Sequence, residues 1–459
     1  IHHGIASLVP VVKNFGYDVR VIQMESDIGE QAFCKQIQEL NPSIVGYSYT
    51  SLQTKFLKRY SHAIESLPNI LQIAGGTGAT LDPHIPDTAV SGFVIGEGEM
   101  PLNDLLYAME NGNDFAKVKG FVWHKDGKTM ATPATRFVED INALDFPDYT
   151  VFDRNIVVYG SPLNINVMIS RGCPYKCNFC SNHALRGAYE SSQGYSRSLT
   201  PDNAILFLEK LRARYPEVEF ISFEDDLLIV NKHWFLEFAA KYKERIGLSC
   251  QLNLRVECVN PEIITALKEI SCRVVFLGVE SGNEQFRREM LNRKHTNQDI
   301  IDKTRLIREA GIKLFTFNIV GFPHETKEQM MDTLNLNKQI QPNTGTCTYF
   351  YPFPGTALFN ICKRDGFLDD IDIENLPSNY NTRPIISRTD KEKKDCVQVM
   401  KKMNAYFEWQ NLKHKVSSYK KGHFAVALAF YTACLLGFYA MRRLISHNYQ
   451  LKIYHFLTN

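Results

Sequence analysis

The sequence predicts an α/β protein with two parallel-sheet domains, followed by a helical C-terminal region. Two observations lead to this prediction. Short apolar runs alternate with helix-like segments over residues 1–110, and a second series of six such units begins near residue 164. Strands that alternate with amphipathic helices form a parallel sheet, because each helix returns the chain to the starting edge of the next strand.

The composition is that of an ordinary globular protein. The 459 residues are 44% hydrophobic and 22% charged, and this length allows two or three domains. A net charge of +2 gives no bulk attraction to nucleic acid, so we expect no nucleic-acid partner. Of the 11 cysteines, those outside one short loop are scattered. They indicate free thiols in a reducing cytoplasm, not a disulfide framework.

The first domain is predicted to span residues 1–125. Helical periodicity covers residues 5–15, 29–40, 54–67 and 100–109, and strand-like runs cover residues 18–24, 43–49, 71–74 and 92–95. The last two strands end in the turns Gly75-Gly76-Thr77-Gly78 and Gly96-Glu97-Gly98-Glu99. Glycine lets a backbone approach a ligand closely, and ligand loops follow the carboxyl ends of parallel strands. An ordinary doubly wound domain with tight turns would explain the same pattern.

Residues 126–160 are predicted to be a connector that begins with a hairpin turn at Asp126-Gly127. Residues 161–370 form the second domain, a partial and open form of the (β/α)8 barrel with six units. Its strand-like runs cover residues 164–169, 219–223, 249–254, 273–278, 313–320 and 346–351. Polar residues follow these strands, at the end where such barrels place their chemistry.

Three cysteines lie on one loop just after the first strand of this barrel. Cys173, Cys177 and Cys180 have the spacing C-x3-C-x2-C. Three thiolates can hold three irons of a 4Fe–4S cluster and leave the fourth iron open to another ligand. A zinc site is the alternative. Zinc usually takes four protein ligands, commonly as two C-x2-C pairs; no second pair is present, and His183 is the remaining candidate.

This loop, with Phe179 before the last cysteine, resembles that of the radical S-adenosylmethionine (radical SAM) enzymes. The resemblance implies that the open iron chelates SAM. One electron, supplied by a donor such as flavodoxin or ferredoxin, would then cleave SAM to methionine and a 5′-deoxyadenosyl radical. The matching positions imply SAM contacts at Phe179, Asp225, Asp226, Arg255, Glu280 and Ser281. Solvated loop carboxylates or helix N-caps are the structural alternative for the acidic residues.

The first domain resembles the cobalamin-binding domain that precedes many radical SAM cores. The similarity rests on the order and spacing of Gly4, Gly16-Tyr17, Val45-Gly46-Tyr47-Ser48 and the two glycine-rich turns. It implies cobalamin contacts at Ser48, Gly75, Gly76, Thr77, Gly96, Glu97 and Gly98. The opening strand of that domain is absent, so we expect N-terminal sequence to be missing. The D-x-H-x-x-G motif that supplies a cobalt-binding histidine elsewhere is also absent.

Together these resemblances predict an enzyme with a 4Fe–4S cluster, SAM and cobalamin that methylates an unactivated carbon or a phosphorus centre. Its substrate would be a small molecule or a lipid-like one. Two alternatives remain. One is a radical SAM cyclase or ring-rearranging enzyme with the same cofactors, and the other is a non-catalytic cobalamin-binding regulator.

The C-terminal region, residues 371–459, is predicted to be helical as far as residue 415. Residues 424–441 then form 18 uncharged residues between two basic pairs, which reaches the lower limit for a bilayer span. A helix buried against the barrel or an amphiphilic surface helix would also fit this segment. We therefore expect a cytoplasmic enzyme that can associate peripherally with a membrane through this segment.

Overall fold

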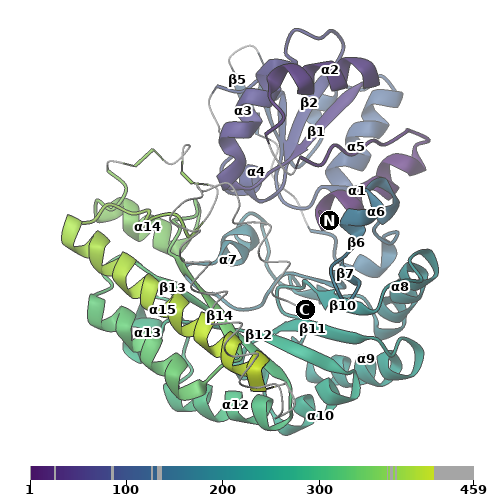
Figure 1. Cartoon of the computed structure of the whole chain (residues 1–459). Coiled ribbons are helices and arrows are strands. Elements are labelled where there is room, and N and C mark those ends of the chain that lie inside the picture. Colours follow the sequence, from purple (N-terminus) through teal and green to yellow (C-terminus); the bar gives the residue numbers. More distant parts are fainter. Residues whose placement is uncertain are drawn as a thin grey trace.

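The computed structural model describes residues 2–24, 27–83, 87–125, 128–131, 137–369, 371–372, 376–377 and 380–417. Two sheets organise the chain: a smaller N-terminal one at the top of Figure 1, and a larger one that curves below it. Both sheets consist mainly of parallel strands with helices between them, as the sequence predicts.

The N-terminal sheet has the strand order β1-β2-β3-β4-β5. Its strands are β1 (Ile44–Ser48), β2 (Leu71–Gly75), β3 (Gly92–Val94), β4 (Phe121–Lys125) and β5 (Lys128–Ala131). The first three are parallel, and β4 and β5 form the predicted antiparallel hairpin, whose Asp126-Gly127 turn lies outside the described residues.

The expected strand at residues 18–24 is wrong. This segment is described and carries no strand, because it pairs with no neighbour and a β-strand requires a hydrogen-bonded ladder. Its alternating pattern of apolar and polar residues was therefore not sufficient evidence for a strand.

Five helices accompany the N-terminal sheet: α1 (His3–Asn14), α2 (Glu30–Leu40), α3 (Thr54–Ala63), α4 (Thr77–Leu81) and α5 (Glu99–Glu110). Phe33 and Ile37, four residues apart on α2, are its buried side chains, which is the expected helical period. Helix α3 ends earlier than predicted, because the N–H of Ile64 already donates to the carbonyl of Ser61 in a tighter turn.

The second sheet has the order β14-β13-β12-β11-β10-β7-β6. Its strands are β6 (Val158–Tyr159), β7 (Asn164–Val167), β10 (Phe220–Phe223), β11 (Ser249–Leu254), β12 (Cys272–Glu280), β13 (Lys313–Val320) and β14 (Thr344–Tyr349). All are parallel to their neighbours except the short β6. Six parallel strands in sequential order confirm the predicted partial barrel.

Helices cover the outer side of this sheet, and its concave side turns toward the N-terminal domain (Figure 1). The covering helices are α8 (Pro201–Arg214), α9 (Lys232–Arg245), α10 (Pro261–Glu269), α12 (Asn297–Glu309) and α13 (Lys327–Ile340). Side chains cap their first turns. Thr200 and Asn260, each followed by a proline, accept hydrogen bonds at the starts of α8 and α10.

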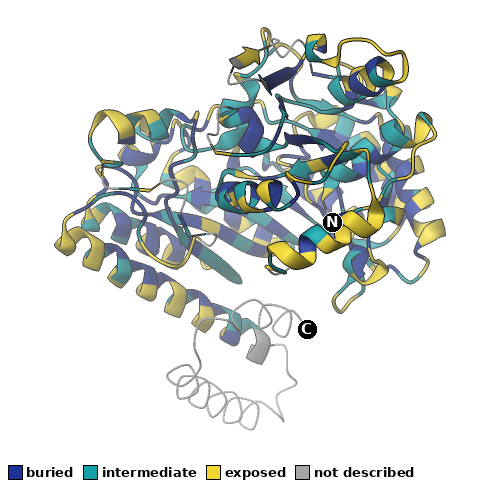
Figure 2. Cartoon of the chain, turned by 90° about the horizontal axis from the view of Figure 1, so that it is seen from above, coloured by how far each residue is buried: buried dark blue, intermediate teal, exposed yellow. Residues whose placement is uncertain are grey.

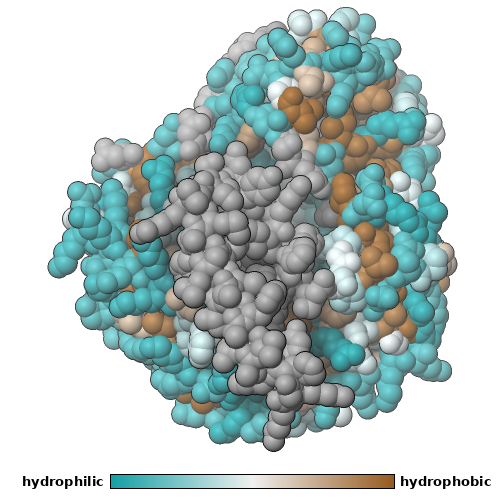
Figure 3. Space-filling view, in the orientation of Figure 1, coloured by the Kyte–Doolittle hydropathy of each residue, from teal (hydrophilic) through white to brown (hydrophobic). Residues whose placement is uncertain are grey.

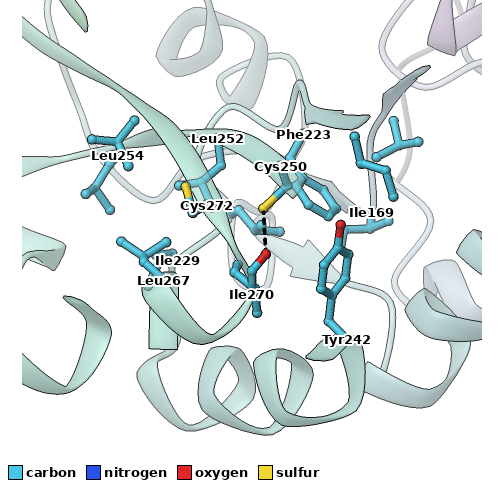
Figure 4. Packing of buried hydrophobic residues seen from close by; sticks show 14 of the residues in the cluster. Ile169, Phe223, Ile229, Tyr242, Cys250, Leu252, Leu254, Leu267, Ile270 and Cys272 are labelled. Atoms are coloured by element: carbon cyan, nitrogen blue, oxygen red, sulfur yellow. Dashed lines mark hydrogen bonds between the residues drawn. The ribbon is translucent and has the colours of Figure 1, made fainter. Parts of the chain in front are cut away.

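The main core lies between the sheet and these helices. Figure 4 shows Leu252 and Cys250 of β11 packed against Ile270 and Tyr242, and the Cys250 thiol donating to the Ile270 carbonyl. Burial of such side chains contributes about 25 cal/mol per Å² of apolar surface. In Figure 2 buried residues follow the strands and the inner sides of the helices.

The predicted C-terminal helix is α15 (Asp390–Ser417), which packs on β14 and α13 through buried residues such as Met403 and Phe407. In the described part of the chain, no helix combines the length and the apolar character that crossing a bilayer requires. Residues 424–441 lie outside that part. In Figure 3 the described surface is mostly hydrophilic, with hydrophobic patches on the upper domain and along the right-hand side.

Candidate active site

The cysteine loop, residues 173–180, lies at the carboxyl end of β7. After β7 the chain forms β8 (Ser170–Arg171), which pairs with β9 (Arg197–Ser198). Gly172 follows with φ +77°, a left-handed conformation that favours glycine. Helix α7 (Ser181–Arg186) begins directly after Cys180. The loop is therefore bounded by a strand pair on one side and a helix on the other.

The loop is anchored by the side chain and backbone of Asn178. Its amide nitrogen donates to the carbonyl of Met290 at 2.9 Å, and its backbone N–H donates to the carbonyl of Leu291 at 3.2 Å. Its carbonyl accepts from the N–H of Leu358 at 3.0 Å, at the start of α14 (Ala357–Arg364). Asn178 therefore ties the cysteine loop to two later parts of the barrel.

Asp225 holds the segment that leads into the loop. Its Oδ1 accepts hydrogen bonds from the N–H of Ile169 at 3.0 Å, from the N–H of Ser170 at 2.6 Å and from the Ser170 hydroxyl at 2.5 Å. The side chain is fully buried, and burial raises its pKa to about 7. These bonds give Asp225 a structural role at the predicted SAM-binding edge; a direct SAM contact stays a prediction.

The three thiols differ in their surroundings. Cys177 is buried, whereas Cys173 and Cys180 are half-buried, and burial raises the pKa of Cys180 to about 12. Within the described residues, no group of three or more His, Cys, Asp or Glu side chains is arranged to hold a metal ion. The donor set nevertheless fits an iron–sulfur cluster in its chemistry, because three thiols share one short loop with a positive charge beside it.

Arg255 supplies that positive charge. Its Nη1 donates to the sulfur of Cys177 at 3.2 Å, and its guanidinium lies 3.7 Å from the ring centroid of Tyr175. Its Nη2 also donates to Glu257 at 2.8 Å, and Glu257 lies 3.3 Å from Nδ1 of His295. The structure thus places Arg255, a predicted SAM residue, against the cysteine loop. Glu257 orients the Arg255 side chain.

Glu224 and Asp226 flank Asp225 just after the carboxyl end of β10. Both side chains are exposed to solvent, yet burial by surrounding protein raises the pKa of each, and for Asp226 a hydrogen bond with Asn182 only partly opposes this rise. Asp226 is therefore placed where a bound ligand could reach it.

Glu280 and Ser281 follow β12. Glu280 has φ +63° at a register shift, and its Oε1 accepts from Arg293 at 3.0 Å, although burial still raises its pKa. Arg293 also donates to the carbonyl of Gly278. Ser281 is fully buried, and its carbonyl accepts from Arg287 at 2.7 Å. These bonds fix the shape of the segment after β12, where the sequence predicts SAM contacts at Glu280 and Ser281.

Phe179 joins the cysteine loop to the loop after β13. Its ring lies edge-on to that of Phe322 at 6.1 Å. Glu325 holds this second loop, since its Oε2 accepts from the N–H groups of Gly321 at 2.7 Å and Phe322 at 3.2 Å. Arg388 donates to the carbonyls of Phe322 and Glu325. The loop after β13 is therefore buried and internally hydrogen-bonded.

The predicted cobalamin residues of β1 and β2 meet at one sheet edge. Ser48 ends β1, Gly75 ends β2, and Thr77 begins α4. Gly76, with φ +93°, lies so close to the carbonyl of Tyr49 and the hydroxyl of Ser48 that a Cβ would approach them within 3.1 Å or less. The glycine is thus required for the two loops to meet, which fits a close backbone approach to a cofactor.

The third predicted element, the 96–99 turn, contacts the barrel domain. The N–H of Glu97 donates to the hydroxyl of Tyr189 at 2.8 Å, and its carboxylate pairs with Arg197 at 2.6 Å and Arg171 at 3.5 Å. Glu99, in the first turn of α5, pairs with Arg171 at 2.6 Å. Arg171 and Arg197 are members of β8 and β9, so this network reaches the strand pair whose two strands lie before and after the cysteine loop in the chain.

Gly96 and Gly98 complete the turn. Gly96 has φ +84°, and its N–H donates to the hydroxyl of Thr80 at 2.9 Å, whereas Gly98 directly precedes α5. The structure therefore gathers every predicted cobalamin residue at the carboxyl ends of β1 to β3, on the side that faces the cysteine loop. Cobalamin contacts themselves stay predictions.

Sequence reasoning missed the residues that hold these loops. They are Asn178, Arg293, Arg171, Arg197 and Tyr189. Asn178 lies inside the cysteine motif and could have been singled out there. The other four have no local signal, because their partners lie 13 to 100 residues away in the chain.

Comparison with known proteins agrees with this geometry. Residues 167–336 match the Radical SAM superfamily. An uncharacterized methyltransferase of Pyrococcus horikoshii is 26% identical over 374 residues, covering 80% of this chain and 79% of the relative. The anaerobic magnesium-protoporphyrin IX monomethyl ester cyclase of Cereibacter sphaeroides is 28% identical over 379 residues, covering 77% of this chain and 59% of the relative.

A solved structure shares the fold of almost the whole chain. The cobalamin-dependent S-adenosylmethionine radical enzyme OxsB, with aqua-cobalamin and SAM bound, superposes with a TM-score of 0.65, at 14% identity, over 95% of this chain and 73% of OxsB. Residues 167–336 thus form a radical SAM domain, and the methyltransferase relative agrees with the enzyme that the sequence predicts. In particular, the chain has a radical SAM domain that follows an N-terminal domain, an arrangement shared with OxsB. The radical SAM domain and the methyltransferase relative favour an enzyme over the non-catalytic cobalamin-binding regulator.

Proposed function

We propose that this chain is a cobalamin-dependent radical SAM methyltransferase that acts on an unactivated carbon or a phosphorus centre. When bound, the cluster with SAM and the cobalamin would supply a carbon-centred radical and a methyl group. Cys173, Cys177 and Cys180 would hold the cluster, and the turns that follow β1 at Ser48 and β2 at Gly76 would approach the cobalamin. The methyltransferase relative and the fold shared with OxsB support this assignment.

One observation carries the proposal. The cysteine loop and the glycine-rich turns lie at the carboxyl ends of their two sheets, and the pair Arg171–Glu99 joins the two edges at 2.6 Å. Loops that meet in this way can present two cofactors to one substrate. Asp225, Asn178 and Arg255 would keep the cysteine loop in position.

An external electron donor, such as a flavodoxin or ferredoxin, belongs to this proposal, as does a substrate that is a small molecule or lipid-like. The proposal also includes a peripheral association with the membrane through residues 424–441. We infer this membrane contact from the uncharged sequence of that segment alone.

The test is anaerobic reconstitution followed by assay of 5′-deoxyadenosine and mass spectrometry of candidate products. The Cys177→Ala variant should release no deoxyadenosine, whereas Cys34→Ala, a half-buried cysteine of the N-terminal domain, should match the unchanged protein. Deoxyadenosine formation by the Cys177 variant would refute the ligand assignment. Absence of bound corrinoid after reconstitution would refute the cobalamin part.

A ring-forming reaction is the second candidate, favoured by the 28% identity to the anaerobic cyclase. The same mass spectra separate the two reactions. Methylation adds one CH2 unit to the substrate, whereas oxidative ring closure removes hydrogen atoms and adds no carbon.

A further inference from the structure

The concave side of the seven-stranded sheet carries side chains that the covering helices do not reach. On β12 and β13, Val275, Leu277 and Leu314 point to the helices and are fully buried. The alternate residues, Phe276, Phe315 and Phe317, face the other way, because neighbouring side chains of a strand point to opposite sides. Phe317 is 37% exposed, a large value for a phenylalanine in a sheet.

These three phenylalanines form one apolar surface, the aromatic floor. Phe276 and Phe315 pair across β12 and β13 with ring centroids 5.1 Å apart. Phe317 lies 5.2 Å from Phe315 and 5.8 Å from Phe276, with its ring nearly parallel to the latter. Ile319, the next residue of β13 on this side, and Phe179 of the cysteine loop pack against the same buried cluster. The aromatic floor therefore leads along β13 to the candidate active site.

The other half of the concave side is a row of hydrogen-bonded polar residues, the amide wall. The Tyr159 hydroxyl donates to Oδ1 of Asn166 at 2.6 Å, and Nδ2 of Asn164 donates to the Tyr159 oxygen at 3.1 Å. The Ser222 hydroxyl donates to Oδ1 of Asn164 at 3.0 Å, and Nε2 of Gln251 donates to Ser222 at 2.7 Å. This chain of bonds fixes which atom each amide presents.

Two polar atoms at the ends of the amide wall remain for a ligand. In the described part of the chain, Nδ2 of Asn166 and Oε1 of Gln251 make no hydrogen bond. One is a donor and the other an acceptor.

The arginines at the active-site end of this side are already paired: Arg255 pairs with Glu257 at 2.8 Å, and Arg293 pairs with Glu280 at 3.0 Å. Lys313 begins β13 at the opposite end, and the exposed carboxyl of Glu224 follows β10 without an ion pair among the described residues. A carboxyl at the active-site end disfavours an anionic ligand.

We propose that the substrate bound on this concave side is a neutral molecule with a flat apolar ring system and a group that donates and accepts hydrogen bonds. The ring system would lie on Phe276, Phe315 and Phe317, where aromatic contact adds to apolar burial. The polar group would meet Asn166 and Gln251. This inference rests on the proposed function, because it names the substrate of that reaction.

The test uses two fluorescent probes on the reconstituted enzyme: neutral N-phenylnaphthylamine and its anionic counterpart, anilinonaphthalene sulfonate. The neutral probe should bind at least about fivefold more tightly than the sulfonate. The Phe317→Ser variant should bind it about tenfold more weakly. Phe115→Ser is the matched control, since Phe115 is 38% exposed and lies in the N-terminal domain. It should bind the probe as the unchanged protein does.

Equal loss in the two serine variants would overturn the proposal, as would equal or tighter binding of the sulfonate. The comparison of the two probes in the unchanged protein needs no variant, so it decides the matter even if Phe317→Ser does not fold. Deoxyadenosine release is measured in the same samples without probe. Its absence would refute the proposed function, whereas the probe titration tests the concave side alone.

Discussion

The cysteine loop and the 96–99 turn both follow parallel strands, yet different interactions hold them. The cysteine loop is held within its own domain, by Asn178, Asp225 and the backbone groups they bind. The 96–99 turn is held across the domain boundary, by the ion pairs of Glu97 and Glu99 with Arg197 and Arg171. The shape of the first loop therefore depends on the folding of one domain, and that of the second on the docking of two.

This difference shows that a charged residue in a predicted ligand loop can stabilise the conformation of the loop and need not contact the ligand. Glu97 lies in a glycine-rich turn that resembles a cofactor site, and its carboxylate is occupied by two arginines and the N–H of Val138. The backbone of such a turn remains the part that can approach a ligand.

The largest loss of stability is expected when a residue that holds the cysteine loop within its own domain is replaced. Asp225→Ala leaves three buried donors at Ile169 and Ser170 without an acceptor and should lower the free energy of unfolding by about 3–5 kcal/mol. Iron retained after reconstitution should fall with it. Asp225→Asn keeps an acceptor oxygen and should cost about 1 kcal/mol. Equal losses in chemical denaturation of the two variants would contradict this role.

A smaller loss of stability is expected when an ion pair that holds the 96–99 turn across the domain boundary is removed. Arg197→Met removes the buried 2.6 Å pair with Glu97, while Arg171 stays 3.5 Å from that carboxylate, so the loss should be about 2–4 kcal/mol. Limited proteolysis should then cleave between the domains faster. Arg245→Met, which breaks an exposed pair with Glu209, is the control and should cost about 0–1 kcal/mol. Equal losses of stability in Arg197→Met and Arg245→Met would show that the pair across the domain boundary has no special role.

The pH dependence of stability tests the loop after β13. Burial raises the pKa of Glu325 to about 8, above the value of about 4.3 in unfolded chains. Between these values the native state keeps a proton that the unfolded state has lost, so stability falls as pH rises, by up to about 1.4 kcal/mol per pH unit. Glu325→Gln should flatten this decline in thermal melts between about pH 5 and 8. A parallel decline in the variant would show that other groups cause it.

The smallest effect concerns the charge beside the cluster ligand. Arg255→Met removes the donor 3.2 Å from the Cys177 sulfur, and loss of a positive charge should make the midpoint potential of the reconstituted cluster more negative. A charged hydrogen bond of about 1.4 kcal/mol corresponds to about 59 mV for one electron. Arg255→Lys should recover part of the shift, measured by potentiometric titration with electron paramagnetic resonance. An unchanged potential in Arg255→Met would remove Arg255 from this role.

Local sequence was sufficient to predict the parallel strands of both sheets and the cysteine loop, but not the short β6. The six parallel strands of the barrel lie within three residues of their predicted ends, because apolar runs bounded by helix patterns have one stable arrangement. The pattern failed at residues 18–24, where alternation was present but the described chain offers no strand to pair with. Strand formation is a pairwise property, so one segment cannot determine it alone.

Some site residues could likewise be assigned from the sequence, whereas others could be assigned only from the tertiary structure. Cys173, Cys177 and Cys180 could be assigned from spacing alone, because three ligands on one loop are close in any conformation of that loop. The roles of Asp225 and Glu97, the placement of Arg255 against Cys177 and the aromatic floor were decided only by the tertiary structure. The physical reason is that a hydrogen bond or ion pair acts over about 3–4 Å, and partners tens of residues apart reach that distance only when the whole sheet is assembled.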